Sequence, residues 1–482
     1  MKKLLSLVLV LSMVLTMGLS IAQAAEEPTK IIWWLYAASD APIDTQLVVD
    51  AANKYSAEKI GVEVELVFKN DDQFGLDMNT GVYYDMTFTC DWANDFVTNA
   101  ANEMFYDITD LVKTATPALY ASMEEKYWTN AGSLNGKIYA VPTLKDMASQ
   151  QFFRFDKDRF EAIGIKIPDY MTFAELEPML KAYKENYTDL YPLMMGKGGL
   201  TGMNNSAQWI AGTYLCSPYH LAGTDRENKI IPFWEDEVVM ERYTLLSKWY
   251  RMGYINPDAA TIESIGSDIR AAIRSGSAWP GYYKGYSSWA GINVEGSCYA
   301  GPFMSLATMR GAMNAINAAA TEEQAIACLK YLELLSTDRT FRDILRYGVE
   351  GIHFNYEEVD GVKAVKRSEQ GIKNWSMDAF VTGSVVNASV TTDAIYDWEE
   401  IFKGYEKAII STLGTWSFVG TDVEAEMAAC SAVMAKYNAE LLTGTIDIEA
   451  KLPEIKAELE QAGIYVVQAE AQRQLDAYLA GN

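Results

Sequence analysis

Apolar and polar positions in the first part of the chain predict strands that alternate with helices. The run "TKIIWWLYA" at 29–37 is apolar and strand-like. Asp40 and Pro42 then open a predicted helix, in which apolar positions recur at helical spacing as far as Tyr55. Residues 62–68 alternate as in a strand, and "DMTFTCDW" at 85–92 follows a further short helix. This order predicts a parallel α/β sheet.

The same order of elements returns after residue 146. "SQQFFRF" at 149–155 is a predicted strand, and Thr172 with Glu175 forms a capping box for the helix that follows. Further helices are predicted before Gly253 and after Thr321, and the chain is mostly helical in pattern from about Asp397. No repeat, low-complexity tract or long linker interrupts the pattern. Since 482 residues exceed the usual size of one hydrophobic core, two α/β lobes are expected.

The stretch "NGKIYAVPTLKD" at 135–146 indicates where the chain leaves the first lobe. A turn pair precedes a short strand that ends at Pro142, and two charged residues, Lys145 and Asp146, come before the next strand. A proline stop, two charges and a new strand predict a crossing between two globular lobes, with polar side chains at the mouth of a cleft.

The first 24 residues have the three parts of a secretory signal. Lys2 and Lys3 precede an apolar stretch from Leu4 to Leu19, and Ala22-Gln23-Ala24 follows as a small-residue cleavage site. The alternative is a membrane anchor, but the apolar stretch is short for a spanning helix of about 20 residues. We therefore expect an exported, soluble mature protein.

Charge and cysteine content narrow the function classes. The chain has 40 basic and 65 acidic residues, a net charge of −25, which disfavours nucleic acid and anionic lipid as partners. With 49% hydrophobic residues it is able to bury a full core. The five cysteines are scattered without a C-x-x-C pair, and Cys328 lies on the apolar side of a predicted helix, where a buried free thiol is expected.

Sharp catalytic motifs are missing from the sequence. The two histidines, His220 and His353, are too far apart for a zinc-protease motif, and neither a G-x-S-x-G elbow nor a phosphate-binding loop occurs. A pair of carboxylates for glycoside hydrolysis remains possible among 65 acidic residues. The sequence therefore predicts no catalytic residue, metal ligand or cofactor.

Aromatic residues at predicted strand ends point to a binding cleft instead. Ligands of open α/β sheets bind at the carboxyl ends of strands, and flat rings stack on the C–H faces of sugars while polar neighbours bind the hydroxyls. Trp33 is assigned to the core because it points opposite to Trp34. The predicted ligand-binding residues are Trp34, Tyr36, Asp91, Trp92, Asn94, Lys145, Asp146, Trp279, Tyr282, Tyr283, Tyr286 and Trp375.

Several stretches together resemble one known family. "NGKIYAVP", "YTLLSKWYRMGYINPDAAT", "SDIRAAIRSGSAWPGYY" and "MNAINAAATEEQAIACLKYLELLSTD" resemble, in this order, segments of the extracellular solute-binding proteins of the maltose-binding type that serve ABC importers. "CDWANDF", "RYGVEGIHF" and the tail "GTWSFVGTDVEAEMAACSAVMAKY" resemble a subfamily with its own C-terminal extension. The likeness covers nearly all of the mature chain.

The resemblance implies an α/β, two-lobed periplasmic-binding-protein-like fold of type II. It implies further crossings near 298–303 and 350–354, with His353 serving the second of these turns by packing or hydrogen bonding. The expected domains are a signal peptide at 1–24, an N-lobe at 25–143 plus 302–349, and a C-lobe at 144–301 plus 354–482. Unlike many Gram-positive relatives, the chain has no cysteine before Cys90, so a periplasmic location and free secretion both remain open.

The implied function is that of a non-enzymatic, monomeric receptor. It would trap a carbohydrate, an oligosaccharide in particular, by hinge closure and deliver it to an ABC transporter permease. Two alternatives remain: a secreted glycosidase that uses a carboxylate pair, and a binding protein for a non-sugar solute such as a peptide or a modified amino acid.

Overall fold

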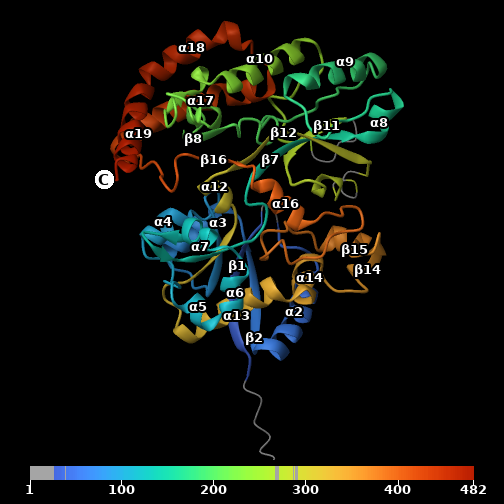
Figure 1. Ribbon diagram of the computed structural model, residues 1–482, viewed down its shortest axis with the longest axis vertical. Coiled ribbons are helices and arrows are strands. Elements are labelled where there is room, and N and C mark those ends of the chain that lie inside the picture. The colour runs from blue at the N-terminus through green and yellow to red at the C-terminus, as the bar shows by residue number, and fades with distance from the viewer. Residues whose placement is uncertain (1–26, 38–39, 266–270, 286, 288–290, 482) are drawn as a thin grey trace, which may run out of the picture.

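The protein is seen here as a computed structural model that describes residues 27–37, 40–265, 271–285, 287 and 291–481. The predicted signal at 1–24 and the candidate Tyr286 lie outside these residues. Two lobes are stacked along the long axis of the molecule, with β1 and β2 in the lower lobe and β7, β11 and β12 in the upper one (Figure 1).

The first lobe is built on a five-stranded sheet of order β2-β1-β3-β13-β6. β1 runs parallel to β2 and β3, as the strand–helix–strand pattern predicts, whereas β13 is antiparallel to both of its neighbours because the chain enters it from the other lobe. The strands are β1 (Thr29–Tyr36), β2 (Val62–Lys69), β3 (Met86–Thr89), β6 (Ala140–Pro142) and β13 (Met313–Ile316), with a small hairpin of β4 (Ser133–Leu134) and β5 (Lys137–Ile138) beside them.

Helices cover both faces of this sheet and enclose two apolar clusters, one around Trp33 and one around Phe88. Gly61 ends the first helix with a positive φ of 66°, and Thr321 with Gln324 forms the predicted capping box of α13. The helices are α2 (Thr45–Ile60), α3 (Asp71–Thr80), α4 (Phe96–Ala101), α5 (Leu111–Ala115), α6 (Pro117–Ala121), α7 (Glu125–Asn130), α13 (Glu322–Thr337) and α14 (Arg339–Tyr347).

The second lobe contains a four-stranded sheet of order β11-β7-β12-β16 and a three-stranded sheet of order β10-β9-β8. Their strands are β7 (Ser149–Asp156), β8 (Ala207–Ala211), β9 (Leu215–Pro218), β10 (Ile231–Pro232), β11 (Ile273–Ser277), β12 (Val294–Met304) and β16 (Ile409–Ile410). The helices are α8 (Lys157–Ala162), α9 (Glu177–Asn186), α10 (Glu237–Arg251), α17 (Glu424–Thr443), α18 (Ile448–Gln461) and α19 (Ile464–Leu479).

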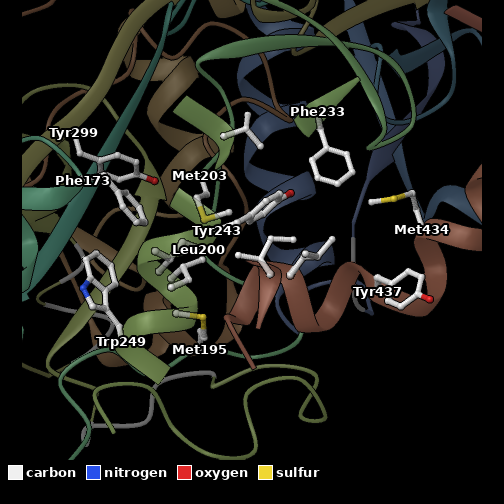
Figure 2. Packing of buried hydrophobic residues seen from close by; sticks show 14 of the residues in the cluster. Phe173, Met195, Leu200, Met203, Phe233, Tyr243, Trp249, Tyr299, Met434 and Tyr437 are labelled. Atoms are coloured by element: carbon white, nitrogen blue, oxygen red, sulfur yellow. The ribbon is translucent and has the colours of Figure 1, made fainter. Parts of the chain in front are cut away.

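One apolar cluster joins the second lobe to the C-terminal helices. Phe173, Tyr243 and Trp249 from the body of the lobe lie in the same cluster as Met434 and Tyr437 of α17 (Figure 2). The C-terminal extension is therefore part of the core of the second lobe and not an appended unit. All five cysteines are buried free thiols, as predicted for Cys328.

The chain crosses between the lobes three times, and the structure corrects two of the predicted positions. The first crossing lies between β6 and β7 and carries Lys145 and Asp146, as predicted. The second follows Met304 instead of occupying 298–303, because β12 stays paired with β7 as far as Phe303. It passes through the short helix α12 (Leu306–Met309).

The third predicted crossing, at 350–354, lies within the first lobe. His353 is fully buried and its Nε2 is 3.0 Å from a carboxylate oxygen of Asp44, at the start of α2. The chain then forms the hairpin β14 (Phe354–Val359) and β15 (Val362–Arg367) beside α14 (Figure 1). After α15 (Glu369–Asn374) and α16 (Trp398–Tyr405), it reaches the second sheet at β16. The segment between α14 and β16 therefore stays in contact with the first lobe. The pattern of apolar and polar residues along the sequence does not reveal these contacts.

Candidate ligand-binding cleft

Two hollows lie where the lobes meet, with volumes of about 500 and about 690 Å³. The smaller hollow receives walls from the first lobe, the second crossing, the second lobe and the C-terminal extension. Its described lining consists of Asp91, Ser149, Asn205, Ala207, Gln208, Trp209, Ile210, Tyr219, Phe303, Ser305, Leu306, Ala307, Thr308, Trp416, Ser417 and Phe418.

Asp91 brings an unpaired carboxylate to the smaller hollow. It follows β3 and the buried Cys90, so the end of the strand places it at the cleft, as the strand-end rule predicts. Among the described residues it accepts no hydrogen bond, although water reaches it from the open side. Burial by the surrounding protein raises the pKa of Asp91 to about 6, partly opposed by the positive charge of Arg310. Such a carboxylate is able to accept hydrogen bonds from the hydroxyl groups of a ligand.

Amide side chains of the second lobe face the same hollow. Asn205 donates through Nδ2 to the Ser149 hydroxyl at 3.2 Å, and the Oε1 of Gln208 accepts the Ser411 hydroxyl at 2.5 Å. These bonds fix both side chains. They leave the Oδ1 of Asn205 and the Nε2 of Gln208 without a hydrogen-bond partner among the described residues, so one acceptor and one donor remain for a ligand.

Aromatic rings form the remaining walls. Tyr219 stacks on Phe303 with ring centroids 4.8 Å apart, and Trp416 lies 6.5 Å from Phe418. Together with Trp209, these rings offer flat apolar faces beside the polar groups. Sequence reasoning missed all five rings, and the one signal for two of them was the glycine-flanked "GTWSFVG" in the C-terminal tail.

Trp92, a predicted ligand contact, is 47% exposed at the end of β3. Its indole nitrogen donates to the carbonyl oxygen of Gly311 at 2.8 Å, and its ring meets Tyr36 and Phe380 edge-on at 4.8 and 6.0 Å. The ring is therefore held in place with one part still open. Its position next to Asp91 agrees with the prediction, which stays a prediction.

The larger hollow is walled mostly by the first lobe, with Tyr282 and Gly285 from the second. It holds two predicted residues, Tyr36 and Tyr282. Its cations are tied to the chain: Arg346 donates to the carbonyl of Met377 at 2.5 Å, and Arg367 donates to that of Trp375 at 2.6 Å. Asp40, Asp378 and Asp393 supply matching negative charge to the same hollow.

Three predicted contacts are buried in the structure, and their burial speaks against a role in ligand binding. Trp34 is 1% exposed and carries the ammonium group of Lys69 over its ring at 4.1 Å. Trp375 is fully buried and donates to the Leu345 carbonyl at 3.3 Å. Trp279 is 6% exposed and stacks on Tyr282 at 4.0 Å.

The remaining predicted residues have structural partners in addition to any ligand role. Asn94 adopts a positive φ of 49° and donates to the Phe88 carbonyl at 2.7 Å, which shapes the turn after β3. Lys145 pairs with Asp146 at 2.7 Å on the first crossing. Tyr283 is half-buried, with its ring 5.4 Å from that of Phe152.

The described residues offer neither a membrane span nor a metal site. No helix in the described part of the chain has the length and apolar character to cross a membrane. Within the same ranges, no group of three or more His, Cys, Asp or Glu side chains is arranged to hold a metal ion.

Comparisons with known proteins find similarity along nearly the whole chain. Residues 412–480 match the model of a domain of unknown function, DUF3502. A carbohydrate ABC transporter substrate-binding protein of Streptococcus pneumoniae is 27% identical over 95% of this chain and 93% of its own length. The lipoprotein LipO of Bacillus subtilis is 23% identical over 47% of this chain and 44% of its own.

Solved structures agree on the fold. The N-glycan transport solute binding protein of S. pneumoniae matches 94% of this chain and 99% of its own with a TM-score of 0.81 at 24% identity. Its complex with Man1GlcNAc matches 94% of this chain and all of its own with a TM-score of 0.76. The chain thus has the two-lobed fold of the solute-binding proteins, and the resemblance to the solute-binding components of ABC transporters that its sequence motifs predict is confirmed.

Proposed function

We propose that this protein binds a carbohydrate between its lobes and delivers it to the permease of an ABC importer. One observation carries the proposal: the smaller hollow joins an unpartnered carboxylate and two oriented amides to aromatic rings, and its walls come from both lobes. Sugars present hydroxyl groups at their edges and C–H groups on their faces, so a site for them needs both kinds of wall.

Each wall has a separate task in binding. The Asp91 carboxylate accepts charge-assisted hydrogen bonds from hydroxyl groups. Asn205 supplies a further acceptor, and Gln208 supplies a donor. Trp209, Trp416 and Phe418 cover the apolar face of a ring. Because Asp91 belongs to the first lobe and the others to the second, a ligand that contacts all of them binds the closed arrangement better and shifts the molecule toward it.

The relatives support a carbohydrate and, more narrowly, an oligosaccharide. The S. pneumoniae structure that matches this chain was solved with Man1GlcNAc and with Man5GlcNAc. We extend to this chain the class of ligand, not the particular glycan. We also propose that the protein acts as a monomer outside the cytoplasmic membrane and that nucleic acid is not a partner.

A glycosidase is the less favoured reading. Hydrolysis needs two carboxyl groups on either side of the scissile bond. The described lining of the smaller hollow includes one, that of Asp91. The S. pneumoniae relative that matches nearly the whole chain is a substrate-binding protein of a transporter, which agrees with a non-enzymatic role.

A thermal-shift screen of the mature protein against a panel of oligosaccharides tests the proposal. A ligand at 100 times its dissociation constant stabilises the folded state by about 2.7 kcal/mol. We expect at least one glycan to raise the melting temperature of the wild type, and to do so less for Asp91→Asn. Mass spectrometry of the recovered glycan should show it intact. If no glycan stabilises the protein but a pool of peptides does, the protein binds a non-sugar solute and the proposal is contradicted.

A further inference from the structure

The C-terminal extension, which matches a domain of unknown function, contributes a segment to the smaller hollow. This segment, residues 411–420 and here called the strap, connects β16 to the helices α17–α19. Trp416, Ser417 and Phe418, in its middle, all line the hollow. Resting on the proposed function, we infer that the last helix, α19, positions the strap so that its rings form a wall that selects the carbohydrate.

One end of the strap is fixed to the second lobe. The Ser411 amide donates to the carbonyl of Met304 at 2.8 Å, next to the pairing of β16 with β12. The Ser411 hydroxyl donates to Gln208, which itself lines the hollow. The start of the strap therefore moves with the sheet of the second lobe.

The other end of the strap is held by two side chains of α19. Gln474 makes two hydrogen bonds with the backbone of Val419. Its Oε1 accepts from the Val419 amide at 3.0 Å, and its Nε2 donates to the Val419 carbonyl at 2.8 Å. The hydroxyl of Tyr478 accepts the amide of Thr415 at 3.1 Å. These bonds bracket Trp416 and Phe418 from either side in the sequence.

The fit between the strap and α19 is close at Gly414. A Cβ atom at this position would lie 2.7 Å from the Tyr478 hydroxyl, and its φ of +58° is one that L side chains rarely adopt. Because Gly414 has no side chain, the backbone of the strap is able to approach the Tyr478 hydroxyl. The close contact between the strap and α19 therefore depends on this glycine.

The rings of the strap are anchored on one side only. Trp416 is 8% exposed and belongs to the core cluster of the second lobe, while Phe418 packs on that cluster and Ser417 is exposed. Core packing alone fixes the depth of the rings. The bonds to Gln474 and Tyr478 fix the course of the backbone between them, and thereby the angle at which Trp416 and Phe418 meet the hollow.

Gln474 is thus a positioning residue, and Gln468 supplies a matched control on the same helix. Gln468 donates to the carbonyl of Ile230 at 2.7 Å, a backbone contact that does not involve the strap. Gln474→Ala and Gln468→Ala each remove a glutamine that binds the main chain, but only the first removes hydrogen bonds to the strap. Phe418→Ala removes a wall ring directly.

The experiment measures affinity for an oligosaccharide found in the panel by calorimetry, together with ¹⁹F spectra of protein labelled with 5-fluorotryptophan. The Trp416 resonance is assigned by its loss in Trp416→Phe. We expect Phe418→Ala to weaken binding about tenfold, since removing a stacked ring costs on the order of one power of ten. Gln474→Ala should weaken it about three- to tenfold and shift or broaden the Trp416 resonance even without ligand. Gln468→Ala should do neither.

Affinity equal to wild type in both Phe418→Ala and Gln474→Ala, with glycan still bound, would overturn the inference while leaving the proposed function standing. An unmoved Trp416 resonance in ligand-free Gln474→Ala would overturn the positioning role by itself. If the wild type binds no oligosaccharide at all, the proposed function fails first, and the role of the strap in selecting carbohydrate fails with it.

Discussion

In the larger hollow, the guanidinium groups of Arg346 and Arg367 donate to backbone carbonyls, but the Nε of Arg367 has no hydrogen-bond partner among the described residues, and three aspartates lie among the same walls. In the smaller hollow, Asp91 has no hydrogen-bond partner among the described residues and water reaches it. The walls of the larger hollow come mostly from the first lobe, whereas the walls of the smaller hollow come from both lobes.

This difference matters more than volume for locating the site. An unpaired group at a boundary between movable bodies gains a hydrogen bond and helps to hold the bodies together. Because its walls come from both lobes, we propose the smaller hollow as the binding site.

The largest expected effect comes from the framework. Trp375 is fully buried in the core of the first lobe, and its carbonyl holds Arg367 at the larger hollow. Trp375→Ala should lower the free energy of unfolding by about 3–5 kcal/mol. In urea denaturation, the midpoint should fall well below that of the wild type. At a temperature where the variant is still folded, calorimetry should give wild-type glycan affinity. A strong loss of affinity in folded protein would instead restore Trp375 as a ligand contact.

Trp92 tests the other side of the comparison. Its partly open ring next to Asp91 should contact the sugar, so Trp92→Ala should weaken binding by about 1–3 kcal/mol, or about 5- to 150-fold. The melting temperature should stay near that of the wild type, because 47% of the residue is already exposed. Tyr283→Ala is the control: half-buried on Phe152, it should lose stability more than affinity. The reverse pattern in the two variants would mean that core and site have been exchanged.

The pH dependence of binding isolates Asp91. Its pKa is raised to about 6, so the carboxylate is fully ionised only above about pH 7 and is largely protonated by pH 5. Because a charged acceptor binds hydroxyls more strongly than a neutral acid, affinity should fall about fivefold between pH 7 and pH 5. Asp91→Asn should bind weakly with a flat profile over this range. A flat profile in the wild type would remove Asp91 from the contact set.

The same pKa has the opposite consequence for folding without ligand. Because the folded-state pKa lies above the ordinary value of 3.8, the folded protein takes up this proton before the unfolded chain does. The contribution of Asp91 to stability therefore improves as the pH falls from about 7 toward 4. Affinity and the Asp91-dependent part of stability should change in opposite directions, which thermal melts of the wild type and Asp91→Asn would reveal.

The smallest effect is expected at Tyr282 in the larger hollow. Tyr282→Phe removes only a hydroxyl from a ring that remains stacked on Trp279. Calorimetry should give an affinity within about twofold of the wild type. A small substitution away from the binding site usually changes the free energy by no more than about 0.5 kcal/mol. A loss of tenfold or more would place the ligand in the larger hollow and reverse the assignment.

Local pattern predicted much of this architecture and less of the site. Capping residues, strand alternation and the proline at 142 located the helices, the first sheet and the first crossing. The strand-end rule located Asp91 at the smaller hollow, with Trp92 as its neighbour in the chain. It failed for Trp34, because β1 lies between β2 and β3 with helices on both faces, so alternate residues of the strand are buried alike.

Contacts far apart in sequence account for the rest. The position of the third crossing depends on the hydrogen bond between His353 and Asp44 and on the buried Arg342, which donates to the carbonyls of Ser384 and Ala379. The aromatic wall depends on a tail that returns over more than a hundred residues to meet β12 and β8. Neither contact leaves a local periodicity from which it could be read.

Small-angle X-ray scattering with and without a panel oligosaccharide tests the central claim most directly. The account predicts that a saturating glycan lowers the radius of gyration of the wild type by drawing the lobes together, with an unchanged circular-dichroism spectrum. Asp91→Asn should need more glycan for the same decrease. An unchanged radius of gyration in wild-type protein shown by calorimetry to be saturated would contradict trapping of the ligand between the lobes.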